Sequence, residues 1–295
     1  MTSELENDAY TVGWICDHEN RVTAQAMLDE EHGRPQTRDP SDDNSYLLGK
    51  VGHHNLVIAC LPAGVRGISS AAIIASKMLT GGGIPSDDYN IRLGDVAVSI
   101  PDRTFGGVVQ FDIGKATPSG FTRTGSLNKP LTALLTAISN LRAMHQLRGS
   151  RIPEYLAQML NKSPRLAKTY VYQGRENDRL FKADYSHQDK HTNPMIYYGT
   201  IASSNKIIKN SLIRDRLRDK FSAICAKTEA ARLIDNFPCV VIRGICNYAD
   251  SHQKGGERWR QYTSATAAAS AKELLYTLQA QEVVQGPLAV NILLG

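Results

Sequence analysis

Hydrogen-bonding side chains gather directly after one apolar run near the end of the chain. Residues 240–242 are β-branched and consecutive, which is typical of a strand whose two faces are both covered, as in a parallel sheet. Asn247, Asp250, Ser251 and His252 follow within ten residues. Open α/β sheets bind their ligands beyond the carboxyl ends of the strands. The pattern predicts a site for a polar ligand, with a purely structural loop of the same composition as the alternative.

The elements that would position these side chains alternate between strand-like and helix-like patterns. This alternation favours a single three-layer α/β/α domain with a central mixed sheet. We expect a lead-in at residues 1–9, the domain at 10–279 and a tail or linker at 280–295. Expected strands are residues 11–16, 46–50, 55–61, 95–99, 107–111, 195–203 and the run from 240. Expected helices are a segment ending near 31 and residues 69–78, 129–147, 152–160, 211–219, 230–233 and 264–279, with an irregular insert at 169–194.

Composition excludes several classes of function. The 295 residues are 42% hydrophobic and carry a net charge of +5 with both signs scattered, which argues against a nucleic-acid groove. No apolar stretch reaches the roughly 20 residues that span a bilayer, and the acidic start is unlike a signal or transit peptide. Five cysteines without a Cys-x-x-Cys pair indicate a reduced, intracellular setting, so we expect a cytoplasmic protein. No cofactor and no metal are expected, because His53 and His54 lack carboxylate or cysteine neighbours in the sequence.

Five stretches between residue 10 and about residue 275 are similar to one known superfamily. They are residues 10–16, 26–32, 91–99, 199–204 and 238–252, and they resemble the purine nucleoside and uridine phosphorylases, which include the methylthioadenosine nucleosidases. The branch most similar stands at the front of fungal multidomain proteins. The resemblance implies cleavage of the N-glycosidic bond of a nucleoside, a purine nucleoside being favoured, with phosphate or water as acceptor. It also implies a homo-oligomer whose pockets are completed by a neighbouring subunit.

Two other functions remain open beside the enzyme. One is a catalytically impaired nucleoside-binding or regulatory module, because fungal relatives often fuse such domains to nucleotide-binding and repeat domains. The other is a degenerate domain without any ligand. Departures from the superfamily pattern at several chemical positions are what keep these alternatives open.

The base-facing position carries an amide instead of an acid. In the nucleosidases that this chain resembles, a carboxylic acid after the strand protonates the purine, and Asn247 occupies that place. An amide cannot act as a general acid, but it can hydrogen-bond a purine ring nitrogen and a carbonyl group. Asp250 is a candidate for the missing acid, and a carboxylate that caps its own loop is the alternative.

The ribose and nucleophile positions match the superfamily less closely. Relatives carry Glu-Met-Glu-Ala, and this chain has Lys227-Thr228-Glu229-Ala230. The resemblance implies that Glu229 grips the sugar hydroxyls and that Thr228 lies under the ring. Glu19, with Asp17 as the alternative, is the candidate that activates water.

The glycine-rich region is shorter than in relatives. An apolar strand precedes the triple glycine there, and on the order of a dozen residues, about one strand with its loop, are missing before residues 81–83. We expect Gly82 and Gly83 to cradle phosphate, with Arg66 reaching an anion from its loop, although a plain surface Arg is the alternative. Ser203 is a further candidate for substrate binding, at the polar end of its strand. Either a neighbouring segment fills the vacant sheet position or the fold is compromised.

Overall fold

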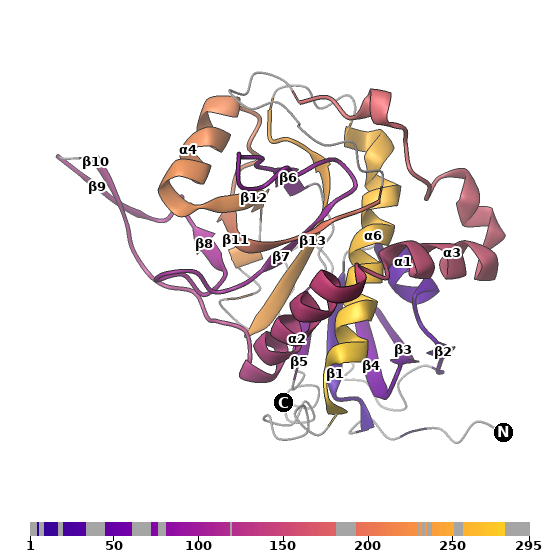
Figure 1. The fold of residues 1–295 in the computed structure, drawn as a ribbon. Coiled ribbons are helices and arrows are strands. Elements are labelled where there is room, and N and C mark those ends of the chain that lie inside the picture. The colour runs from indigo at the N-terminus through magenta and orange to yellow at the C-terminus, as the bar shows by residue number, and fades with distance from the viewer. Residues whose placement is uncertain are drawn as a thin grey trace.

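The mixed sheet predicted from the sequence is present and organises the described part of the chain (Figure 1). The computed structural model describes residues 5, 9–16, 20–33, 45–60, 72–75, 81–118, 120–180, 193–228, 230–231, 234, 238–250 and 256–280. Eleven strands form one large sheet, and two more form a separate ribbon. The predicted α/β fold class is confirmed.

One end of the large sheet is built from local pairings. The central strand here is β1 (Val12–Cys16), and β4 (His54–Cys60) runs parallel to it. The predicted hairpin is confirmed, because β3 (Ser45–Val51) pairs antiparallel with β4. The first helix ends earlier than expected: α1 (Arg21–Ala26) is followed by a short edge strand, β2 (Glu30–Glu31). Glu30 stands opposite Lys50 across the strands, a pairing of opposite charges that favours the strand over a longer helix.

A strand occupies the sheet position that the shortened sequence left in question. We expected a helix at residues 69–78, and the part of it that the structure describes is a strand, β5 (Ala72–Ala75). It lies parallel to β1 on one side and to β13 (Cys239–Asn247) on the other. The helix prediction was wrong because two neighbouring buried strands offer backbone hydrogen bonds that outweigh the weak helical preference of small residues. The neighbouring segment therefore fills the gap.

The other end of the sheet closes on itself as a small barrel. Three successive parts of β13 pair with three different strands. The first part is parallel to β5, the middle part is antiparallel to β7 (Val96–Ser99), and the last part is parallel to β6 (Gly81–Gly83). The ring continues from β6 to β12 (Ala223–Thr228), β11 (Ile196–Ser204) and back to β7, and β8 (Val108–Gln110) extends it beside β11. β7, β8, β11 and β13 agree with the predicted strands, whereas β6 and β12 were not predicted. Closure removes the open edges that a shortened sheet would expose.

Helices cover the sheet, and one of them packs along β13. α6 (Gly256–Thr277) packs along β13, and it is surrounded by α1, α2 (Thr132–Arg148) and α3 (Ile152–Lys162). Gly244 makes the close approach possible, because a Cβ there would stand 2.1 Å from the carbonyl oxygen of Thr263. α4 (Ser211–Phe221) packs instead against β11 and β12. One 3₁₀ turn, η3 (Pro164–Lys168), lies directly before the predicted insert, and a second, η4 (Arg175–Asn177), lies within it.

The ribbon of β9 (Gly114–Thr117) and β10 (Gly120–Arg123) projects away from the body (Figure 1). Neither strand was predicted from the sequence. Within the described part of the chain, none of the helices combines the length and the apolar character that a membrane crossing requires.

Candidate functional site

Three strands bring the predicted base-facing residue beside the predicted sugar-facing strand. Asn247 at the end of β13 is in register with Gly82, which is in register with Ala226 of β12. Two strand spacings place the Cα atoms of Ala226 and Asn247 about 10 Å apart. The register of β13 on β6 shifts between Ile245 and Asn247, and such bulges commonly re-aim a side chain near a ligand site.

The Asn247 side chain has a fixed orientation. Its Oδ1 accepts a hydrogen bond from the backbone N–H of Ala249 at 2.9 Å, which closes an Asx turn. Its Nδ2 lies 3.6 Å from the Cys246 sulfur, a weak acceptor. The side chain is partly exposed. The turn therefore uses the amide oxygen and leaves the amide NH2 as the group that can meet a ligand.

Strand alternation separates the predicted binding residues into two sets. Thr228 is two residues from Ala226, so it lies on the same face as Gly82 and Asn247. Ser204 is paired with Thr228 and shares this face, whereas Ser203 is paired with Lys227 on the opposite face. The Ser203 Oγ accepts a hydrogen bond from the Ala231 N–H at 3.0 Å, so it anchors the chain that follows β12. Ser203, which the sequence predicts to bind substrate, therefore lies on the opposite side of the strand from Thr228 and Asn247, and its binding role stays a prediction.

Gly82 and Gly83 form a packed strand and not the expected phosphate-cradling turn. A Cβ at Gly82 would lie 2.5 Å from the Cβ of Ala249, and one at Gly83 would lie 2.7 Å from a methyl group of Ile245. Both glycines are buried. Their lack of side chains lets the barrel close tightly against the loop that follows Asn247, which corrects the expectation of a glycine-rich turn. Whether they also bind substrate stays a prediction.

Buried charged residues lie behind this face. Lys227 and Arg243 are 4% and 0% exposed, and Asp250 is 5% exposed. Burial raises the pKa of the Cys225 thiol to about 12, and the nearby positive charges of Arg243 and Lys227 oppose that rise. Two cations thus approach the same buried thiol from β12 and β13. The interior behind Thr228 and Asn247 is therefore polar and rich in positive charge.

The remaining predicted residues differ in what the structure describes. Asp250 lies three residues after Asn247 and is buried, and its role as an acid stays a prediction. Glu229, Glu19 and Arg66 lie outside the described residues. Their roles stay predictions. Among the described residues, no three His, Cys, Asp or Glu side chains come together in a group that could hold a metal ion.

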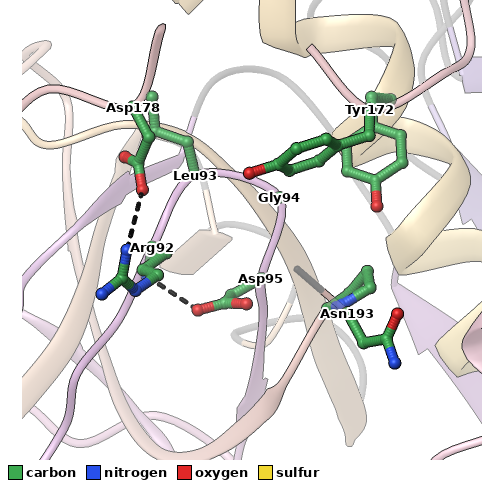
Figure 2. A pocket seen from close by; sticks show the side chains of 9 residues that line it. Arg92, Leu93, Gly94, Asp95, Tyr172, Asp178 and Asn193 are labelled. Carbon is green, nitrogen blue, oxygen red and sulfur yellow. Dashed lines mark hydrogen bonds and ion pairs between the residues drawn. The ribbon is translucent and has the colours of Figure 1, made fainter. Parts of the chain in front are cut away.

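A second polar feature lies on the α6 side of the same strand end (Figure 2). The loop before β7 is joined to β13 there, because the Gly94 N–H donates to the Ile245 carbonyl oxygen at 2.9 Å. A small pocket opens beside this loop, and its lining consists of Arg92, Leu93, Gly94, Asp95, Tyr172, Asp178, Asn193, Pro194 and Tyr262. Four separate segments contribute the lining, namely residues 92–95, residues 172 and 178, residues 193–194 and residue 262, so no local sequence pattern predicts the pocket.

Comparison with known proteins relates the chain to one curated fungal protein. No protein-family model matches the chain. A nucleotide-binding leucine-rich repeat (NLR)-like protein of Hyaloscypha variabilis is 42% identical over 303 residues, which cover 94% of this chain. The chain spans only 30% of the length of that relative.

Solved nucleosidases share the fold at low sequence identity. Futalosine hydrolase of Helicobacter pylori matches with a TM-score of 0.56 and 13% identity, over 90% of this chain and 97% of that one. A mutant nucleosidase of the same organism with 5'-methylthioadenosine in the active site gives 0.55 and 14%, over 90% and 98%. A putative methylthioadenosine/S-adenosylhomocysteine nucleosidase of Borrelia burgdorferi bound to adenine gives 0.56 and 15%, over 90% and 98%. The chain therefore shares the fold of these solved nucleosidases.

Proposed function

We propose that residues 10–279 bind a purine nucleoside at the end of β13 and cleave its N-glycosidic bond. The observation that carries this proposal is the fixed amide of Asn247, which shares one face with Thr228 in a nucleosidase fold. The base would meet the Asn247 amide, and the sugar would lie toward Thr228 and the segment that carries Glu229. Solved neighbours of this fold contain methylthioadenosine or adenine, which supports a purine ligand.

The orientation of the amide favours one class of purine. Because the Asn247 oxygen accepts from Ala249, the group offered to the base is an N–H donor. A 6-oxopurine presents acceptors at both N7 and O6, whereas adenine presents an acceptor at N7 and a donor at the 6-amino group. We therefore expect inosine or guanosine to be preferred over adenosine.

The acid and the nucleophile are assigned to different residues. Asp250 follows Asn247 by three residues and is buried, and it is proposed as the proton donor because Asn247 cannot serve. Glu19 is proposed to activate water, and Arg66 is proposed to hold phosphate if phosphate is the acceptor. We also propose that the active form is a homo-oligomer, which light scattering on the purified protein would test.

A binding module without turnover is the second candidate. The amide at 247 favours it, because the general acid of the resembling nucleosidases is absent at that position. The NLR-like relative is compatible with it, since one fold can carry catalysis in one protein and binding alone in another.

One experiment separates the two candidates. Purified protein is incubated with inosine, guanosine, adenosine and 5'-methylthioadenosine, with and without phosphate, and free base is measured by chromatography. Parallel calorimetric titrations measure binding. Free hypoxanthine or guanine supports cleavage, and dependence on phosphate identifies the acceptor. Heat of binding without any free base supports the module, and the absence of both overturns the proposal.

A further inference from the structure

Tyr248 links the base-facing loop to a distant segment of the chain. It follows Asn247 directly and is 2% exposed. Its hydroxyl donates a hydrogen bond to the Asp178 carboxylate, seventy residues away in sequence. Asp178 belongs to residues 172–178, part of the insert that the sequence predicts to be irregular. We call these residues the strap.

The strap is fastened to α6 and to the loop before β7. The Arg258 guanidinium donates to the Asn177 side-chain oxygen at 2.8 Å, and the Trp259 indole donates to the Asn177 carbonyl oxygen at 3.3 Å. The Tyr172 ring packs edge-on against Trp259, with ring centroids 5.4 Å apart. These contacts hold the strap in place without using Tyr248.

Asp178 is placed to act as a fixed anchor. The Arg92 guanidinium points toward its carboxylate at 3.8 Å, and both side chains are more than nine-tenths buried (Figure 2). The Leu93 backbone also hydrogen-bonds the carboxylate. A carboxylate held by a guanidinium and a backbone group on one side has little freedom to follow Tyr248 if the loop moves. The Tyr248 hydroxyl therefore bonds to an acceptor that is set by the strap and the β7 loop.

The opposite side of the base-facing loop is held by α4. The Ala249 carbonyl oxygen accepts from the Asn210 N–H at 3.0 Å, and the Tyr248 carbonyl oxygen accepts from Arg214 at 3.3 Å. These two bonds fix backbone atoms on the α4 side. Loss of the Tyr248 hydroxyl would remove the hydrogen bond to the strap and keep these two bonds on the α4 side, so we expect the loop to shift toward α4 and re-aim the Asn247 amide.

We propose that Tyr248 is a positioning residue: through Asp178, the strap sets the direction in which Asn247 presents its amide to a bound base. This inference rests on the proposed function, and it concerns how that same site selects its base. Loss of a hydrogen bond between a buried hydroxyl and a carboxylate corresponds to a change of roughly tenfold or more in an equilibrium. The expected consequence is a loss of discrimination between 6-oxopurine and 6-aminopurine nucleosides.

The test uses four variants of the full chain. Tyr248→Phe removes the hydroxyl and keeps the ring, and Asp178→Ala removes the acceptor. Asp178→Asn keeps an oxygen that can accept from Tyr248, so it should restore most of what Asp178→Ala loses. Tyr172→Phe is the matched control, because it removes a hydroxyl from the same pocket without touching the base-facing loop.

Two measurements are made on each variant. Hydrogen exchange of residues 245–250 reports the order of the loop and needs no ligand. The ratio of inosine to adenosine in binding constant, or in kcat/KM where turnover occurs, reports the aim of the amide. This ratio does not depend on the fraction of folded protein, so a merely structural role would not change it.

The proposal predicts faster exchange of residues 245–250 and a roughly tenfold fall of the ratio in Tyr248→Phe and Asp178→Ala. Asp178→Asn and Tyr172→Phe should stay within about threefold of wild type. Unchanged exchange in Tyr248→Phe overturns the inference, as does an unchanged ratio in a wild type that binds nucleosides. If wild type neither binds nor cleaves any nucleoside, the proposed function fails. Loop exchange still decides whether the strap positions residues 245–250.

Discussion

Gly82 packs so closely against Ala249 that a Cβ at position 82 would lie 2.5 Å from the Ala249 Cβ and 2.7 Å from its backbone nitrogen. The N–H group on this Ala249 nitrogen donates the hydrogen bond that orients the Asn247 amide. Barrel closure and the candidate base site therefore depend on one contact. The absence of a side chain at Gly82 is what allows Ala249 to approach β6 this closely.

Replacement of Gly82 by Ala should destabilise the protein and disturb the loop after β13. The clash involves backbone atoms, which cannot move aside as a flexible side chain can, so we expect a loss of about 1–3 kcal/mol. Urea unfolding measures it. Gly33→Ala is the control, because no atom lies within 4 Å of a Cβ there. Equal stability of the two variants would contradict the packing described for β6.

Replacement of Asn247 by Asp should change the chemistry while keeping the turn. A carboxylate oxygen can accept from the Ala249 N–H as the amide oxygen does, and a carboxylic acid can also protonate a leaving base. We expect the release of adenine from adenosine to rise at least about tenfold, whereas Asn247→Ala should weaken the binding of every purine nucleoside. Chromatography of the free base measures the first effect and calorimetry the second. If Asp and Ala at 247 gave the same result, the amide would have no role in base recognition.

The strand assignment of residues 72–75 predicts slow backbone exchange. β5 lies between β1 and β13, and amides in a central strand open only with large parts of the fold. Their hydrogen exchange should therefore be as slow as that of Val12–Cys16. A helix on the surface would exchange much faster, and that result would refute the replacement of the missing strand by β5.

His54 should make stability depend on pH. Burial lowers its pKa below the ordinary value of 6.5, and a hydrogen bond to the Leu278 carbonyl oxygen at 2.9 Å opposes that effect in part. The unfolded chain then binds the proton more tightly than the folded one. The stabilising contribution is full above pH 6.5 and is lost as the pH falls through the lower, folded pKa.

Thermal melting of wild type and His54→Asn between pH 8 and pH 5 measures this contribution. The difference in melting temperature between the two proteins should be largest at pH 8 and should shrink toward pH 5. A difference that grows as the pH falls would mean that the folded protein prefers the charged imidazole.

Elements with a strong residue pattern of their own were predicted correctly from the sequence. Elements whose conformation depends on the adjacent strands of the sheet were not. Residues 240–242 read as a buried strand on their β-branched side chains alone, and β13 confirms it. Gly81–Gly83 has the composition of a turn, and only the strands on either side make it β6. The small residues before it suggested a helix, but the slot between β1 and β13 makes residues 72–75 a strand.

The same limit applies to the site. Asn247 and Thr228 were predicted from the superfamily pattern, and the register shows that they share a face. The face on which Ser203 lies could not be predicted, because a shift of one residue exchanges the two faces of a strand and the register of β11 on β12 depends on both strands together. Tyr248, Asp178 and Arg92 come together from three distant segments, so no local pattern could have found them.

A crystal structure of the protein soaked with inosine tests the central claim most directly. We predict that hypoxanthine or the intact nucleoside is bound with an acceptor atom of the base within about 3.2 Å of the Asn247 Nδ2. In the intact nucleoside, the sugar should lie on the side of Thr228. A nucleoside bound elsewhere, such as the pocket lined by Arg92 and Tyr172, or no nucleoside bound at all at saturating concentration, would contradict it.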